Sequence, residues 1–216
     1  MNPYIKKFLL TVTCVVFSIV SVNLLASTEK SWRFKVYLDD KEIGYHKVEV
    51  SPVSDETHVR IEARYNVDFL FFTAYKYEHS NYEIWLNDCL HYISSNTNDN
   101  GNHQYVVAEK NDTAINIKTS ESQETIDGCI KSFAYWDPDF LNSKKLLNTQ
   151  TGEIIPVTIQ YISEENIKTR NGFIPGDRYK LVANDFTMDL WYSKQDEWLG
   201  LHSNLSNGST LKYLIQ

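Results

Sequence analysis

The chain has 216 residues, and its 28 acidic side chains against 21 basic ones give a formal net charge of −7. Acidic surfaces repel phosphate backbones and anionic headgroups, so the composition argues against nucleic-acid binding and against adhesion to anionic membranes. Aromatic residues are abundant, with 14 Tyr, 10 Phe and 5 Trp, and such residues favour β-strands.

The N-terminal segment has the pattern of a secretory signal peptide. Lys6 and Lys7 form a basic start, an apolar run extends from Phe8 to Val20, and the small residue Ala26 ends the segment. We therefore predict a signal peptide over residues 1–26. Leu24, two residues before Ala26, is unfavourable for a signal peptidase, so an uncleaved inner-membrane anchor is the alternative.

Residues 27–216 are expected to form a single domain, since no repeat or low-complexity linker divides them. Period-two alternation begins at Trp32, Phe34, Val36 and Leu38 and recurs up to Ile215, which is typical of strands with one buried and one solvated face. Asn100-Gly101 predicts a hairpin turn.

The exceptions to strand patterning are few. Cys129–Trp136 is read as a strand, and Asp137-Pro138 predicts a helix cap followed by a short helix over residues 138–147. The predicted fold class is all-β, a curled antiparallel sheet of about eleven strands that forms a barrel or half-barrel.

Two cysteines remain after the signal peptide, Cys89 and Cys129. In an oxidising compartment two such cysteines are more often bridged than free, so we predict a disulfide; two buried thiols on neighbouring strands are the alternative.

Residues 67–72 interrupt the alternation with large apolar side chains on both faces. One interpretation is a fully buried strand. The other is an apolar rim at which Phe69, Phe71 and Phe72 contact a lipid-like ligand or a membrane-bound partner.

No motif indicates catalysis, a cofactor or a metal. Cys89 and His91 lie two apart, but zinc sites need three or four ligands, and no C-x-x-C or H-x-x-x-H completes such a set. No G-x-S-x-G is present, and paired carboxylates cannot be selected from 28 acidic residues. We predict no metal and no cofactor.

Several blocks carry a resemblance to a known family. These are the run Gly128–Pro138, the run Leu146–Glu153, Asp189–Tyr192 and Trp198–Leu201. Together they resemble an uncharacterised family of exported proteobacterial proteins, known only as a domain of unknown function. The resemblance implies a Gram-negative periplasmic location. The strand pattern is also remotely similar to the lipoprotein carriers LolA and LolB, which hold acyl chains against a curled sheet.

If the first block forms a site, Tyr135 and Trp136 present their rings at the start of the short helix, which Asp137 caps. Asn148, Gln150 and Thr151 then form a polar patch nearby. Trp191 is a further candidate ligand contact.

Three functions follow as hypotheses. The leading one is a periplasmic, non-enzymatic binding protein or chaperone for a lipid-like or other apolar molecule. The second is an envelope assembly module that docks a protein partner through an edge strand or through Trp191 and Trp198. The third is an enzyme acting on envelope lipid or glycan.

Overall fold

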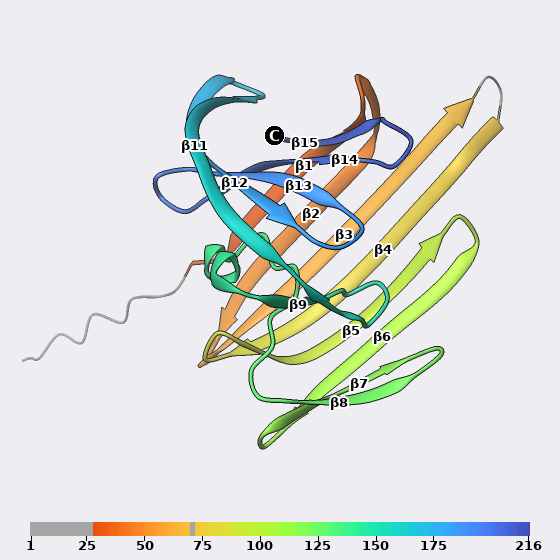
Figure 1. The fold of residues 1–216 in the computed structure, drawn as a ribbon, viewed down its shortest axis with the longest axis vertical. Coiled ribbons are helices and arrows are strands. Elements are labelled where there is room, and N and C mark those ends of the chain that lie inside the picture. Colours follow the sequence, from red (N-terminus) through yellow and green to blue (C-terminus); the bar gives the residue numbers. More distant parts are fainter. Residues whose placement is uncertain (1–27, 70–71) are drawn as a thin grey trace, which may run out of the picture.

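The structure, a computed structural model, describes residues 28–69 and 72–216 (Figure 1). The predicted signal peptide and Phe71 lie outside these residues. The described part contains fifteen strands and one short 3₁₀ helix. The strands of the first half are β1 (Lys30–Leu38), β2 (Lys41–Val53), β3 (Glu56–Phe69), β4 (Phe72–Leu86), β5 (Cys89–Asp99), β6 (Asn102–Asn111), β7 (Ala114–Thr119) and β8 (Gln123–Asp127). The second half contains η1 (Pro138–Asn142), β9 (Lys145–Leu147), β10 (Ile154–Pro156), β11 (Thr158–Thr169), β12 (Gly172–Val182), β13 (Thr187–Tyr192), β14 (Trp198–Asn204) and β15 (Thr210–Ile215).

Thirteen of these strands form one antiparallel sheet. Its order is β11-β12-β13-β14-β15-β1-β2-β3-β4-β5-β6-β7-β8, so the first and last strands of the chain pair in its interior. The sheet curls, but the described β8 and β11 remain edges and do not pair with each other. The all-β antiparallel class is confirmed, whereas the closed barrel and the count of about eleven strands are wrong.

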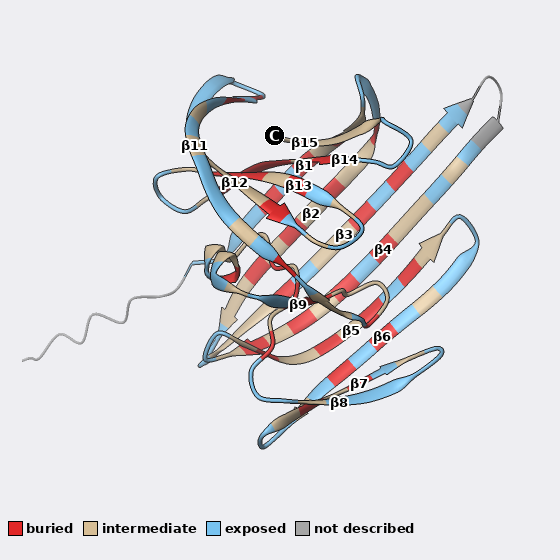
Figure 2. Ribbon diagram, in the orientation of Figure 1, coloured by how far each residue is buried: buried red, intermediate tan, exposed pale blue. Residues whose placement is uncertain are grey.

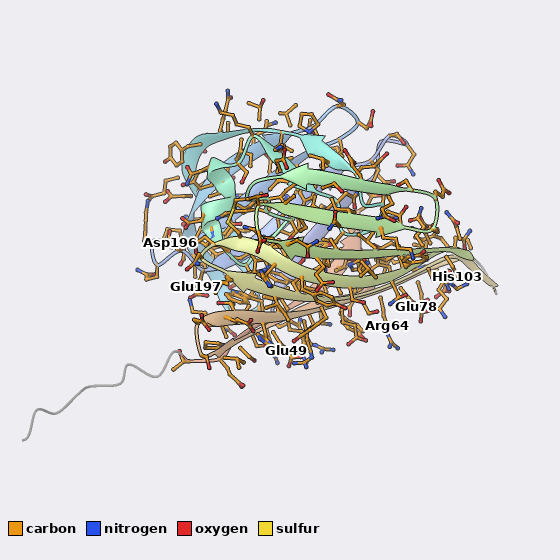
Figure 3. The ribbon with its side chains drawn as sticks, turned by 90° about the horizontal axis from the view of Figure 1, so that it is seen from below. Glu49, Arg64, Glu78, His103, Asp196 and Glu197 are labelled. Carbon is orange, nitrogen blue, oxygen red and sulfur yellow. A yellow bond between two sulfur atoms is a disulfide. The ribbon has the colours of Figure 1, made fainter. Side chains whose placement is uncertain are left out.

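Alternation along the strands decides which face is buried (Figure 2). In β1, Trp32, Phe34 and Val36 are buried while Arg33 is exposed. Most strands of the sheet thus contribute alternate side chains to one hydrophobic core on the inner face of the sheet. The outer face of β2–β4 is charged, and Figure 3 shows Glu49, Arg64 and Glu78 projecting from it.

Residues 128–157, here called the crossing segment, lie against the inner face. They contain η1, β9 and β10, and their buried apolar side chains belong to the main core: Ile130, Ala134, Phe140, Leu146 and Leu147. The open sheet hides its aromatic inner face with this segment instead of closing on itself.

The crossing segment also corrects two predicted elements. Only Pro138–Asn142 is helical, and residues 145–147 form β9, which pairs with β10. Asn142 and Ser143 favour helix ends over helix interiors, and Leu146 and Leu147 are fully buried in β9. Residues 129–136 do not form a strand; they make one isolated bridge, Ser132 to Leu147.

The C-terminal end of strand β11 folds over the opposite face of the sheet. The Arg170 backbone N–H donates to the Ile215 carbonyl at 3.3 Å, which ties the end of β11 to the end of β15. Beneath it, Ile167, Trp191 and Leu199 form a second, small hydrophobic cluster. Gly200 permits this approach, since a Cβ there would lie 2.8 Å from Ile167 Cδ1.

The Asn100-Gly101 turn is confirmed, with both residues at positive φ between β5 and β6. Within the described residues, no helix is long and apolar enough to cross a membrane.

Candidate functional site

A pocket of about 200 Å³ lies between the inner face of the sheet and the crossing segment. One wall comes from β2, β3 and β4 and consists of His46, Val48, Ile61, Ala63, Tyr65, Tyr77 and His79. The crossing segment supplies the facing wall: Phe133, Tyr135, Trp136, Asn148, Thr149 and Gln150. Phe186, Trp198 and Tyr213 complete the lining. None of these side chains is an acid, a lysine or an arginine.

Strand register brings the histidines into this wall. His46, Ala63 and His79 are consecutive cross-strand partners on β2, β3 and β4. Because the side-chain period of a strand is two, all three point to the same inner face. Burial lowers the pKa of His46 to about 3, with a smaller repulsive contribution from His79. Burial alone lowers the pKa of His79 to about 4. Both imidazoles are therefore neutral near pH 7.

Two buried polar atoms of the lining have no hydrogen-bond partner among the described residues: His46 Nδ1 and Trp136 Nε1. Buried polar atoms are normally paired, so an unpaired one needs a ligand or an ordered water to satisfy it. Other polar groups of the lining do have hydrogen-bond partners. His79 Nδ1 lies 2.8 Å from Thr97 Oγ1, and the Tyr77 hydroxyl donates to Gln150 Oε1 at 3.1 Å.

Aromatic rings form much of the pocket surface. Tyr65 and Tyr77 stack with centroids 5.1 Å apart, and the Tyr65 and Tyr213 hydroxyls share a 2.6 Å hydrogen bond. Burial raises the pKa of Tyr213 to about 12, so this hydroxyl stays protonated. Tyr135 packs against Trp198 with centroids 5.2 Å apart. The pocket is thus a neutral, ring-lined space with a few polar positions.

A buried carboxyl group anchors the crossing segment next to the pocket. Glu83 is fully buried and accepts hydrogen bonds from Asn81 Nδ2 at 2.8 Å, Trp85 Nε1 at 2.7 Å and Ser132 Oγ at 3.0 Å. Burial raises the pKa of Glu83, and the three donors oppose that rise. Since Ser132 belongs to the crossing segment, this cluster joins the segment to β4.

Three further contacts hold the crossing segment. The predicted disulfide between Cys89 and Cys129 is confirmed, with the two Cα atoms 5.3 Å apart, and it fixes the start of the segment to β5. The Tyr192 hydroxyl donates to the Tyr135 carbonyl at 2.8 Å. The Ser95 hydroxyl donates to the Thr149 carbonyl. The rings of the segment are therefore held over the sheet from several sides.

The sequence-predicted site residues fall into three groups. Tyr135 and Trp136 line the pocket, together with Asn148 and Gln150 of the predicted polar patch. The expected cap is present, because Asp137 Oδ1 accepts from the Asp139 backbone N–H at 3.1 Å. Thr151 is not part of the pocket lining; its hydroxyl donates to Glu153 Oε2 at 3.0 Å.

The second group is Phe69 and Phe72, whose backbones pair at the end of the β3–β4 hairpin, while Phe71 is outside the described residues. The run 67–72 therefore includes the end of one strand and the start of the next.

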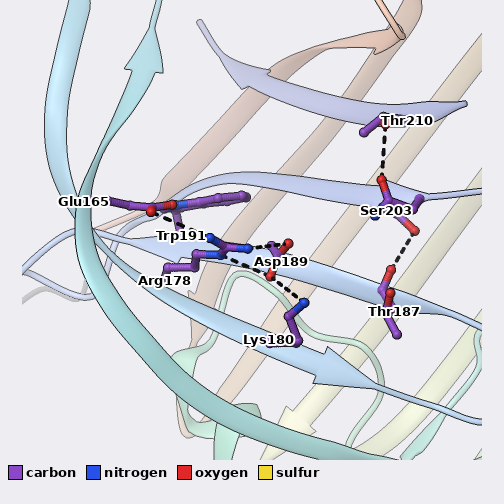
Figure 4. A network of polar contacts seen from close by, with 9 residues as sticks. Glu165, Arg178, Lys180, Thr187, Asp189, Trp191, Ser203 and Thr210 are labelled. Carbon is purple, nitrogen blue, oxygen red and sulfur yellow. Dashed lines mark hydrogen bonds and ion pairs between the residues drawn. The ribbon is translucent and has the colours of Figure 1, made fainter.

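Trp191, which makes up the third group of predicted site residues, lies on the face of the sheet opposite to the pocket. Its indole N–H donates to Glu165 Oε1 at 2.8 Å, and the Arg178 guanidinium lies 5.7 Å from its ring centroid (Figure 4). The Arg178 guanidinium also donates a bidentate pair of hydrogen bonds to the Asp189 carboxylate, from Nε at 3.1 Å and from Nη2 at 3.0 Å. Trp191 and Trp198 are only 5% and 1% exposed. The surroundings of Trp191 are thus an ion-pair network under β11, separate from the pocket.

Sequence patterns did not single out His46, His79 or Glu83. The alternating pattern assigns each of them to the same face as its buried neighbours at i±2, but their proximity to one another depends on the cross-strand register. Among the described residues, no group of three or more His, Cys, Asp or Glu side chains is arranged to hold a metal ion.

The fold and the pocket define a class of protein, an open, curled antiparallel sheet filled by a disulfide-anchored segment. The model of a family described as "domain of unknown function (DUF6134)" matches residues 34–216, and the chain belongs to this family. The expected relation to an uncharacterised family is confirmed at that level. No curated protein matches the chain.

Among solved structures, the chain is similar to a β-barrel-like protein of the domain of unknown function DUF1849 from Brucella abortus. The TM-score is 0.62 at 6% sequence identity, over 87% of this chain and 94% of that one. A likeness at this identity concerns the fold alone. The likeness to LolA and LolB stays a prediction.

Proposed function

We propose that this protein is an exported, non-enzymatic binding protein or chaperone that holds a lipid-like or other apolar small molecule. The observation that carries the proposal is the pocket between the inner face of the sheet and the crossing segment, with its ring-lined walls. Concave, mostly apolar spaces with a few polar groups are the usual form of small-molecule sites.

The polar groups of the pocket favour binding over catalysis. A general acid or base works best when its pKa lies near the working pH. Burial holds His46 and His79 in the neutral form, at pKa values of about 3 and about 4, and raises the pKa of Tyr213 to about 12. These groups offer hydrogen bonds near pH 7 and are poorly matched to proton transfer.

The periplasmic location is part of the proposal. It is supported by the N-terminal signal pattern in the sequence and by the Cys89–Cys129 disulfide, since disulfides persist in oxidising compartments. Fractionation of cells that produce the full chain, with N-terminal sequencing of the product, tests it. A cytosolic, uncut protein would contradict it.

The binding proposal is tested on protein purified from the periplasm. Native mass spectrometry should show a bound small molecule that organic extraction releases. The Ala63→Leu variant adds bulk to a small, buried side chain of the pocket wall, so it should reduce the fraction of protein with bound ligand. Parent protein that is repeatedly free of ligand would overturn the proposal.

A second candidate function is docking of an envelope protein at the β11 edge of the sheet. The observation that favours it is a set of exposed apolar side chains there, Tyr161 at 55% exposure, Ile162, and Phe173 at 70% on neighbouring β12. Crosslinking from a photoreactive residue placed at position 161 tests it, with a residue on the charged outer face, such as Glu49, as the control site.

A further inference from the structure

We infer that the pocket selects a compact, uncharged molecule about the size of one substituted ring, which carries both a hydrogen-bond donor and an acceptor. This inference rests on the proposed binding function and adds the ligand's size, charge and polarity. It excludes ionised fatty acids and long acyl chains as the occupants of this pocket.

Size is the first argument. An engineered apolar cavity of about 150 Å³ holds one benzene molecule. The pocket of about 200 Å³ therefore has room for one ring with small substituents, whereas a long acyl chain would extend beyond its walls. The ring faces of Tyr65, Tyr77 and Trp198 provide the flat surfaces on which such a molecule packs.

Charge is the second argument. Among the described residues that line the pocket there is no lysine, arginine, aspartate or glutamate, and the two histidines are neutral near pH 7. The fully buried carboxyl group of Glu83, on β4, is already hydrogen-bonded by three donors. An ion bound against these walls would give up part of its hydration without gaining an opposite charge, which is unfavourable. The pocket therefore discriminates against carboxylates and ammonium groups.

Polarity is the third argument. Trp136 Nε1 can only donate a hydrogen bond, so it requires an acceptor on the ligand. His46 Nδ1 donates or accepts according to the tautomer of the ring. A ligand group with both functions, such as a hydroxyl or a primary amide, satisfies either tautomer. The two orphaned atoms come from opposite walls, β2 and the crossing segment, so ligand contacts would also link these walls.

Benzamide and benzoate form a probe pair of nearly the same shape that differs in charge near pH 7.5. Binding to the delipidated full-length mature protein is measured by NMR titration or calorimetry, with dodecanoate as the long, ionised probe. We expect benzamide to bind at least tenfold more tightly than benzoate, and dodecanoate to bind no better than benzoate.

Two variants locate the binding. Trp136→Phe keeps an aromatic ring but removes the N–H donor, and should weaken benzamide binding by several-fold to about tenfold. Tyr161→Phe on the exposed edge strand is the control and should leave binding unchanged. Near-UV circular dichroism of each variant reports whether the aromatic packing is retained.

The outcomes separate the two proposals. Suppose that dodecanoate binds more tightly than benzamide and that Ala63→Leu weakens its binding. That result would overturn the inference about size and charge, and the proposed binding function would stand. Benzamide binding that Trp136→Phe does not change, in a variant that keeps its aromatic packing, would overturn the assigned polar contact. Absence of binding by all three probes, together with ligand-free protein from cells, would overturn both proposals.

Discussion

The two buried histidines predict a specific acid sensitivity. Their pKa values are about 3 for His46 and about 4 for His79 in the folded protein, against about 6.5 for an unfolded imidazole. A depressed folded pKa means that the unfolded chain binds more protons as the pH falls below 6.5. The free energy of unfolding therefore decreases with falling pH, and the decrease stops near the folded pKa values.

The magnitude follows from the linkage relation. Below the unfolded pKa each histidine contributes about 1.4 kcal/mol per pH unit, which amounts to about 2 kcal/mol per histidine between pH 7.5 and pH 5. The free energy of unfolding of the His46→Phe variant should therefore fall by about 2 kcal/mol less than that of the parent between pH 7.5 and pH 5. The pocket beside His46 has room for the larger ring. At neutral pH the variant should be no less stable than the parent, because it also removes the unpaired Nδ1 atom.

Urea unfolding at several pH values between 7.5 and 5 measures this difference. Burial raises the pKa of Glu83, so where this carboxyl titrates it changes the stability with the opposite sign, but that contribution is common to parent and variant and cancels in the comparison. His103→Gln, at an exposed site, is the matched control and should keep the parent's pH dependence. Parallel pH profiles for parent and His46→Phe would refute the reasoning. NMR titration of the folded parent gives an independent check, since both imidazoles should stay neutral at pH 5.

Three further predictions concern the fold. Replacing Cys89 and Cys129 by serine should lower the free energy of unfolding by about 4 kcal/mol, as the chain-entropy model gives for a 40-residue loop, and comparison of reduced and oxidised parent in urea checks this. Gly44→Ala should destabilise the protein by about 3 kcal/mol in thermal melts, because φ is +155° and the added Cβ would collide with the Arg64 carbonyl. Gly208→Ala is the control and should destabilise the protein less, because nothing lies within 4 Å of the added Cβ. Glu83→Gln should destabilise by about 1–3 kcal/mol at pH 7 in urea titrations, since the amide N–H₂ replaces an acceptor that three donors use; an unchanged midpoint would contradict the anchoring role.

Local patterning determines most of the sheet. Alternation at Trp32, Phe34 and Val36 requires a half-buried strand, and Asn100-Gly101 requires a tight hairpin turn, because both signals act through neighbouring residues. Asp137 likewise caps its helix as its sequence context indicates.

The length of that helix could not be read locally. Leu146 and Leu147 are compatible with either a helix or a strand, and their complete burial against the sheet selected the strand β9. Whether the sheet closes into a barrel also depends on tertiary packing. The crossing segment covers the inner face, so the edges β8 and β11 need not meet to bury the aromatic side chains.

The sequence by itself therefore determined the strand class, the short hairpin turns, the helix cap and the pairing of the two cysteines, all of which depend on short-range chemistry or simple counting. Only the tertiary structure decided the site. Tyr135 and Trp136 were predicted from their sequence block, but His46 and His79 joined them through cross-strand register and through the placement of the crossing segment. Proximity between residues that lie far apart in the chain is a property of packing, and single-sequence periodicity does not encode it.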